Sequence, residues 1–310
     1  MIETTFILGN GFDLDLGLKT RYSDFANSEY WVIDSDMQFY SELARYLEEK
    51  KNNNLNWLDL ENSLAEYAAP VINQEQAAKL ALFQAHINDR KCYQKVQESL
   101  GQYIALQERT TIKKESLAAC LLKLMSCFHI ENIFSYNYTD LNIFAQSLHL
   151  RPFQYQHVHG KCDNATQILG ISDREKIRLD YDFLYKTCSS HYRSSNVRYA
   201  LQRSTFVLFF GHSLGPQDYH YFENFFREQS RIDIKEKDKK TIYIITSDDY
   251  SRMQIIKQLR TMNEGHINLL FDCNEFRIFE SRNTPPNEIL AAINAKLTAI
   301  NELKNARMIS

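Results

Sequence analysis

The sequence predicts an α/β protein with a Rossmann-like, mostly parallel sheet, helices on both faces and a large helical insertion after the first strand. Two observations support this prediction. Apolar segments typical of strands alternate with helical segments after residue 129, as in a parallel sheet covered on both sides. Helical spacing of apolar residues dominates residues 28–128, a stretch far longer than a βαβ crossover requires. We therefore expect an α/β core formed by residues 1–27 and 129–310, with the insertion at 28–128.

The first expected strand covers Thr4–Leu8, which is β-branched and aromatic and is bounded by Gly9. Helices are expected at Tyr250–Thr261 and at Asn287–Lys304, where apolar side chains recur at steps of three and four. The remaining expected strands are Ile130–Tyr136, Phe153–His159, Gln167–Gly170, Thr205–Phe210, Thr241–Thr246, Ile267–Phe271 and Phe276–Phe279.

Composition and charge exclude several classes of protein. The net charge of −3 and the dispersed basic residues argue against a nucleic-acid or membrane partner. The longest apolar run, Phe206–Phe210, is too short to span a bilayer, and no signal peptide is apparent. The six cysteines form no Cys-x-x-Cys pair, so we expect reduced thiols, a cytoplasmic location and no metal.

Polar segments follow four of the expected strands. Because the carboxyl ends of parallel strands meet at one edge of a sheet, these segments should gather into one site. Glycine allows a sharp turn and close approach of a ligand, and a strand ending in such a turn can present N–H groups to a phosphate. The four segments are Gly9-Asn10-Gly11-Phe12-Asp13, Asn137-Tyr138-Thr139-Asp140, His157-Val158-His159-Gly160 and Gly211-His212-Ser213-Leu214.

Each segment also has a structural interpretation. Two glycines after a strand commonly form only a tight turn, and Asn137 is typical of a cap for the helix expected near Asp140. His157 and His159 face the same side of a strand, but no third metal ligand accompanies them. We interpret His159 as a general base or a substrate hydrogen-bonder, because imidazole titrates near neutrality. Ser213 lacks the Gly-x-Ser-x-Gly frame of a hydrolase nucleophile.

In this order, the motifs resemble the AbiH family of bacterial phage abortive-infection proteins. The resemblance extends over most of the chain. It is carried by Gly9-Asn10-Gly11-Phe12-Asp13, Gly17-Leu18-Lys19-Thr20-x-Tyr22-Ser23-Asp24-Phe25, Trp57-x-x-Leu60-Glu61, Asn137-Tyr138-Thr139-Asp140, His157-x-His159-Gly160 and Gly211-His212-Ser213-Leu214.

The same order of motifs is distantly similar to sirtuin-like NAD-binding domains. This similarity implies catalytic roles for Asn137 and His159 at the nicotinamide ribose. Sirtuin deacetylases carry a zinc module with Cys-x-x-Cys ligands, which this chain lacks, so protein deacetylation is not expected. The residues implied for NAD binding are Gly9, Asn10, Gly11, Phe12, Asp13, Asp140, Gly211 and Ser213.

The two resemblances together imply an antiphage effector that hydrolyses NAD⁺ to ADP-ribose and nicotinamide. Nicotinamide leaves as a neutral molecule, so a single base for water suffices, a role that suits His159. Expected partners are NAD or a related nucleotide, further copies of the chain in a homo-oligomer, and a phage-derived trigger. The alternatives are a non-catalytic nucleotide sensor, a subunit of a defence assembly, and a nuclease-type effector.

Overall fold

The structure is a computed structural model that describes residues 2–53, 59–70, 85–162 and 166–309. The chain forms two compact units. The first, which we call the sheet unit, comprises Met1–Leu18, Thr111–Val158 and Ser194–Ser310. The second, which we call the helical unit, comprises Lys19–Thr110 and His159–Arg193.

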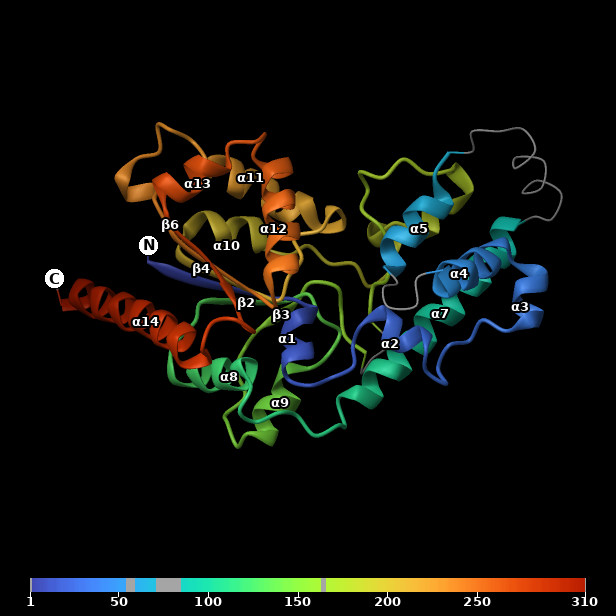
Figure 1. The fold of residues 1–310 in the computed structure, drawn as a ribbon, viewed down its shortest axis with the longest axis horizontal. Helices are drawn as coiled ribbons and strands as arrows, with labels where there is room; N and C mark the ends of the chain where they lie inside the picture. The colour runs from blue at the N-terminus through green and yellow to red at the C-terminus, as the bar shows by residue number, and fades with distance from the viewer. Residues whose placement is uncertain (1, 54–58, 71–84, 163–165, 310) are drawn as a thin grey trace. The chain divides into compact units, whose positions relative to one another are not determined.

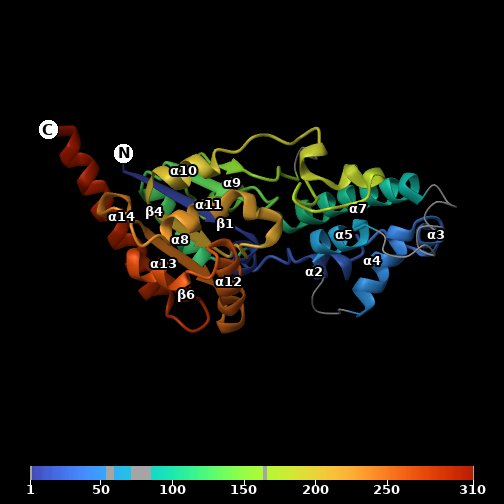
Figure 2. The same cartoon turned by 90° about the horizontal axis from the view of Figure 1, so that it is seen from above.

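The sheet unit contains a six-stranded sheet in the order β3-β2-β1-β4-β5-β6, in which every neighbouring pair is parallel. Its central pair, β1 and β4, lie side by side in Figure 2. The predicted parallel α/β fold is therefore confirmed. The strands are β1 (Glu3–Leu8), β2 (Asn132–Ser135), β3 (Gln156–His157), β4 (Ser204–Phe210), β5 (Thr241–Thr246) and β6 (Glu275–Glu280).

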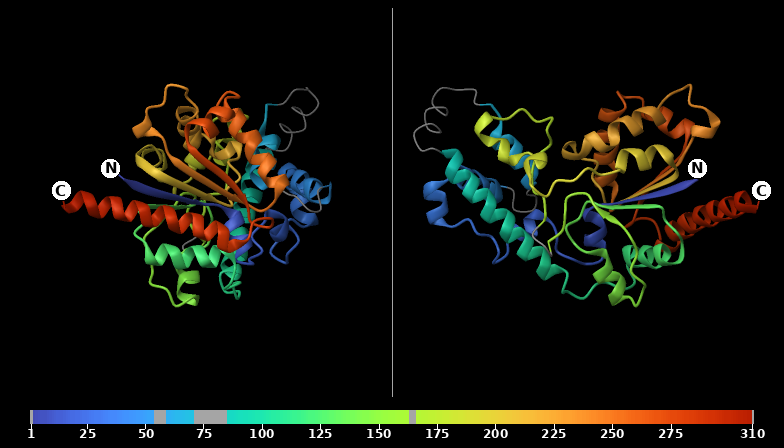
Figure 3. Two further views of the ribbon diagram at one scale, coloured as in Figure 1. Left: turned by 60° about the vertical axis from the view of Figure 1, so that its left-hand side comes forward. Right: turned by 180° about the vertical axis from the view of Figure 1, so that it is seen from behind.

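Helices cover both faces of this sheet (Figure 1). The helix α14, red in Figure 3, runs beside the green α8, and the two contact each other. The α-helices of the sheet unit are α1 (Asn10–Asp15), α8 (Leu117–Cys127), α9 (Leu141–Ser147), α10 (Val197–Arg203), α11 (Tyr219–Gln229), α12 (Asp249–Met262), α13 (Ile267–Cys273) and α14 (Pro286–Ile309). Short 3₁₀ turns are η3 (Pro216–Asp218) and η4 (Glu236–Asp238).

The alternation of side chains along the strands divides the core into two layers. Phe6 and Leu8 of β1 pack in the layer that contains α8, α9 and α14, whereas Ile7 packs in the layer that contains α10–α13. Successive side chains of a strand point to opposite faces, so one buried strand contributes to both layers. This explains why the central strands are continuously apolar, as in Phe206–Phe210, rather than alternating.

Two of the expected strands are wrong. Residues Ile267–Phe271 form most of α13, in which Leu270 is fully buried while Phe271 is largely exposed. A short apolar run does not distinguish a buried strand from a helical turn. Residues Gln167–Gly170 form no strand; the adjacent Ile171 makes only an isolated bridge to Tyr185, in the helical unit.

The two units divide at different residues from the expected insertion bounds of 28–128. The helix α8 belongs to the sheet unit, because its buried Leu121 and Leu122 join the core layer against the sheet. Conversely, His159–Arg193, expected in the core, belongs to the helical unit. Its Gln167 exchanges side-chain-to-backbone hydrogen bonds with Gln97 at 2.7 and 3.1 Å.

A buried carboxylate organises the helical unit. Asp89, fully buried, accepts hydrogen bonds from Ser41 Oγ at 2.6 Å and from the Leu43 N–H at 3.0 Å. It also accepts from the hydroxyls of Tyr67 at 2.6 Å and Tyr181 at 2.7 Å. Four donors thus meet one carboxylate, which ties four segments of the chain together. The elements of this unit are α2 (Tyr22–Ala26), α3 (Ser35–Tyr40), α4 (Glu42–Asn53), α5 (Leu60–Ala68), α7 (Ala85–Gln107), η1 (Leu179–Leu184) and η2 (Lys186–Cys188).

We expect Asp89→Ala to lower the free energy of unfolding of the helical unit by about 3 kcal/mol or more, because it leaves buried donors without an acceptor. Urea denaturation followed by fluorescence measures this loss. The matched control is Asp182→Ala, whose side chain is exposed and which should change stability by less than about 0.5 kcal/mol. A loss below about 1 kcal/mol for Asp89→Ala would contradict the organising role of this carboxylate.

Candidate functional site

The strand order of the sheet unit identifies an edge at which a ligand can bind. The order β3-β2-β1-β4-β5-β6 matches that of dinucleotide-binding sheets, in which the chain connections reverse direction between β1 and β4. Ligands of such sheets bind beyond the carboxyl ends of the strands at this reversal. The segments that follow β1, β2 and β4 are three of the four polar segments picked out from the sequence.

The loops after β1 and β4 pack backbone against backbone. A Cβ added to Gly9 would lie 2.6 Å from His212 Cα, and one added to Gly11 would lie 2.6 Å from Gly211 Cα. Gly211 has φ +66°, and its own added Cβ would lie 2.4 Å from Gly11 Cα and from Phe12 N. Close packing of the two loops therefore accounts for the three glycines.

Main-chain hydrogen bonds occupy the amides expected to hold a phosphate. The Gly9 N–H donates to Phe210 O and the Gly11 N–H donates to Gly211 O, both at 2.9 Å. The Phe12 N–H donates to Gly9 O, also at 2.9 Å. These three amides hold the loops together in the structure. The side chains of Asn10 and Ser213, in contrast, belong to exposed residues of the same two loops.

Asn137 joins the end of β2 to the loop after β1. Its Nδ2 donates to Gly9 O at 3.1 Å and to Asp13 Oδ1 at 2.7 Å. The other carboxylate oxygen of Asp13 accepts from Thr139 Oγ1 at 2.8 Å. Asn137, Asp13 and Thr139 are at most 6% exposed, so this network is shielded from solvent. The structure thus brings Asn137 and Asp13 together, with the asparagine amide used to fix the loop.

A second network connects the end of β2 to β3. His157 Nδ1 lies 3.0 Å from Asn137 O, so Nδ1 carries a proton and donates to this carbonyl. His157 Nε2 lies 3.0 Å from the hydroxyl of Tyr155, which in turn donates to Asp140 Oδ1 at 2.6 Å. Asp140 also caps α9 by accepting from the Asn142 N–H at 2.8 Å. Asp140 therefore lies at the same edge of the sheet as Asn137, where its side chain caps α9.

His212 fixes the loop after β4. Its ring centroid lies 4.4 Å from that of Tyr136, and its Nδ1 accepts from the Leu214 N–H at 3.0 Å. The proton is therefore on Nε2, which lies 3.6 Å from Asp218 Oδ2. Leu214 has φ +53° and is fully buried, so the loop holds a strained residue in addition to Gly211.

The expected base, His159, belongs to the helical unit rather than to the sheet unit of Asn137. It follows Val158, whose N–H donates to Ser135 O at 2.8 Å. Within the helical unit, His159 lies beside Lys186, which pairs with Glu61. Sequence motifs gave no indication of Lys186, because no spacing rule connects it to His159. Trp57, part of the family motif that contains Glu61, lies outside the described residues.

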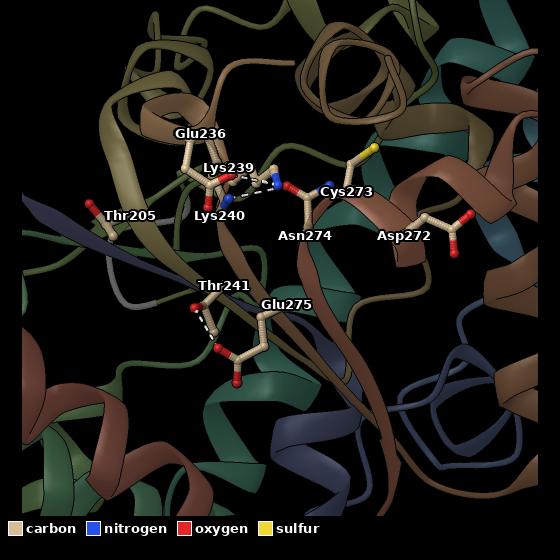
Figure 4. Close-up of a pocket in the computed structure, with 9 residues that line it drawn as sticks. All are labelled: Thr205, Glu236, Lys239, Lys240, Thr241, Asp272, Cys273, Asn274 and Glu275. Carbon is tan, nitrogen blue, oxygen red and sulfur yellow. Dashed lines mark hydrogen bonds and ion pairs between the residues drawn. The ribbon is translucent and has the colours of Figure 1, made fainter. Parts of the chain in front are cut away.

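The cavity in Figure 4, of about 430 Å³, lies at the amino ends of β4, β5 and β6, away from the polar segments. Lys239 pairs with Glu236 at 2.7 Å, and Lys240 Nζ donates to the carbonyl oxygens of Gln202 and Ser204. Burial lowers the pKa of Lys240. These charged groups are already engaged by the protein, so we do not place the functional site in this cavity.

Neither a metal centre nor a membrane span emerges from the described part of the chain. Across residues 2–53, 59–70, 85–162 and 166–309, no three His, Cys, Asp or Glu side chains are grouped so as to hold a metal ion. Over the same residues, no helix has the length and apolar character that a bilayer crossing needs.

Gly211→Ala should destabilise the sheet unit more than Gly265→Ala, by about 2 kcal/mol. Both glycines have positive φ, +66° and +89°, so both alanines incur the same kind of backbone strain. A Cβ added at Gly211 would collide with the backbone of Gly11. A Cβ added at Gly265 would have no atom within 4 Å. Urea unfolding of the two variants measures the difference. Equal losses would show that the two loops are not in close contact.

Comparison with protein families supports the interpretation of the motifs. The family model of bacteriophage abortive infection AbiH matches residues 5–236, which include all four polar segments. Comparison with curated proteins and with solved structures gives no match. Since the family model covers most of the sequence, the chain belongs to the AbiH family of bacteriophage abortive infection proteins.

Proposed function

We propose that this chain acts in abortive infection by hydrolysing NAD⁺ to ADP-ribose and nicotinamide. The observation that carries the proposal is the strand order β3-β2-β1-β4-β5-β6, with polar loops at the carboxyl ends of β1, β2 and β4. Sheets of this order bind dinucleotides at that edge. Family membership supports the role in defence, and the sheet supports the class of ligand.

The dinucleotide would bind the sheet unit through side chains more than through backbone amides. Because the N–H groups of Gly9, Gly11 and Phe12 bond within the protein, we assign the contacts of these loops to Asn10 and Ser213, which are exposed. Hydroxyl and amide groups are suitable donors to phosphate and ribose oxygens.

The reaction needs a water molecule, a base to activate it and a means of stabilising positive charge on the ribose. Nicotinamide is cationic in NAD⁺ and leaves as a neutral molecule, so no general acid is required. His159 is the proposed base, since a neutral imidazole accepts a proton from water near pH 7. The buried carboxylate of Asp13 would stabilise the oxocarbenium-like transition state. Asn137 would act by holding Asp13 and the Gly9 carbonyl in place.

One observation favours a second candidate, a nucleotide sensor that does not turn over its ligand. The Nδ2 group of Asn137 is already engaged by Gly9 O and Asp13 Oδ1, which suits a residue that supports a binding loop. A sensor would bind NAD or a related nucleotide at the same strand ends and release no nicotinamide. The two candidates therefore differ in product formation and agree in binding.

Nicotinamide release from NAD⁺ by the purified chain, alone and with lysate from phage-infected cells, tests the proposal. We expect His159→Gln to reduce the rate by about 10²–10⁴-fold while NAD⁺ binding, measured by calorimetry, is retained. Asp13→Asn should also reduce the rate, because it removes the negative charge near the ribose. The control is His191→Gln, an exposed histidine of the same unit as His159, which should leave the rate unchanged.

The possible results separate the candidates. Binding without nicotinamide release under both conditions would establish the sensor instead of the enzyme. Absence of NAD⁺ binding would overturn both. Full activity of a folded His159→Gln protein would remove His159 from the mechanism. Thermal melting of each variant verifies that it is folded.

A further inference from the structure

A buried ion pair lies beside the imidazole of His159 within the helical unit. Lys186 is 3% exposed and His159 is 5% exposed. Lys186 Nζ lies 3.2 Å from Glu61 Oε2 and 3.5 Å from His159 Nε2. A buried ammonium needs a compensating charge, which Glu61 provides. The imidazole therefore has a fixed cation next to one of its nitrogens.

The backbone holds Lys186 and His159 against the same short segment, residues 168–171. The Ile168 N–H donates to His159 O at 2.7 Å, and the Lys186 N–H donates to Ile171 O at 3.0 Å. Gly170 makes this possible, because a Cβ there would lie 2.6 Å from Leu184 O and 3.3 Å from Lys186 Cγ. Main-chain pairing thus brings the backbones of the two residues together, and the Glu61 carboxylate holds the Lys186 ammonium beside the ring.

The position of the ammonium determines where the imidazole proton is. An ammonium has three donors and no acceptor, so a proton on His159 Nε2 would point at another positive group. The neutral form with its proton on Nδ1 is favoured for this reason. The separation of 3.5 Å exceeds the usual length of an N–H···N bond, so Lys186 acts chiefly through its charge. In this form Nε2 carries no proton and its lone pair is an acceptor, while the nearby cation disfavours the doubly protonated ring.

Other titratable groups interact with this cluster from neighbouring elements. Asp59, which caps α5, has a pKa raised by burial, with the charge of Lys186 acting in the opposite direction. Tyr93 on α7 has a pKa raised by burial, and the charges of Glu61 and Cys188 raise it further. Asp59 and Tyr93 thus interact electrostatically with the Lys186–Glu61 pair. The ammonium of Lys186 lies beside the His159 imidazole.

We propose that Lys186 is a positioning residue that keeps His159 neutral and leaves the Nε2 atom of His159 unprotonated. The catalytic meaning of this inference rests on the proposed function, since a base must be unprotonated before it can activate water. The electrostatic effect on His159 itself is independent of any activity and can be measured without NAD⁺.

The test is an NMR pH titration of the His159 imidazole in the full chain without nucleotide. We expect Lys186→Met to raise the titration midpoint of His159 by about one pH unit or more, because the cation is lost and the Glu61 carboxylate remains. Lys186→Arg should keep the midpoint near that of the unchanged chain, because the charge is retained. In the double variant Lys186→Met with Glu61→Gln, the midpoint should fall below that of Lys186→Met alone.

One control accompanies the titration. The exposed Lys176→Met should leave the His159 midpoint unchanged. An unchanged or lowered midpoint in folded Lys186→Met would overturn the inference. If that variant does not fold, the double variant, from which both charges of the Lys186–Glu61 pair are removed, decides the question. A midpoint in the double variant equal to or below that of the unchanged chain would then overturn it.

Nicotinamide release as a function of pH separates this inference from the proposed function. In Lys186→Met the acid limb of the rate profile should move to higher pH, in step with the NMR midpoint, because His159 becomes protonated earlier. Absence of release from the unchanged chain would contradict the NADase proposal while the NMR shift still supported the effect of Lys186. If nicotinamide is released but the acid limb of the rate profile does not shift with the NMR midpoint, Lys186 does not act through His159 as the base.

Discussion

The amide of Asn137 is the interaction on which the arrangement of the strand ends depends. It joins the carboxyl end of β2 to the loop after β1 through Gly9 O and Asp13 Oδ1. The loop after β1 in turn packs on Gly211 of the loop after β4. Three strand ends are thus fixed relative to one another by this side chain together with the backbone contacts between the loops after β1 and β4. Any ligand at this edge meets loops that are already ordered, which lowers the entropy lost on binding.

The main-chain hydrogen bonds of Gly9 and Gly11 give these glycines a structural role. Glycine at a strand end is compatible with a phosphate site and with close packing between loops, and sequence does not separate the two. Here Gly9 and Gly11 donate to carbonyls of the β4 segment, so their conformational freedom serves the packing of the loops. Under the proposed function, recognition would then depend on side chains such as Asn10 and Ser213. Side chains discriminate between ligands through the positions of their donors, whereas backbone amides at a turn bind phosphates of many kinds.

The sequence predicted the parallel sheet well because strands such as Thr241–Thr246 contain an uninterrupted apolar run, Ile242–Ile245, bounded by polar residues. It failed at Ile267–Phe271, where a short apolar run forms a helix, since periodicity needs more residues to be decisive. The motifs at the strand ends identified Asn137 and Asp13, which the structure joins. Lys186 could not be found in this way. Its proximity to His159 results from the pairing of Ile168 and Ile171 with distant residues, and no local pattern encodes such a contact.

Asp89 and Lys186 are both buried charged groups of the helical unit, and they differ in kind. Asp89 is surrounded by neutral donors, so its charge is stabilised by hydrogen bonds and serves to hold four segments together. Lys186 is compensated by Glu61 and also lies beside a titratable ring. For stability alone, apolar residues in place of a buried ion pair are often as good or better. An ion pair placed against an imidazole has a consequence that apolar residues would lack, because it determines the charge of that imidazole at a given pH. This distinguishes the Lys186 cluster from the Asp89 cluster as a feature suited to chemistry rather than to folding.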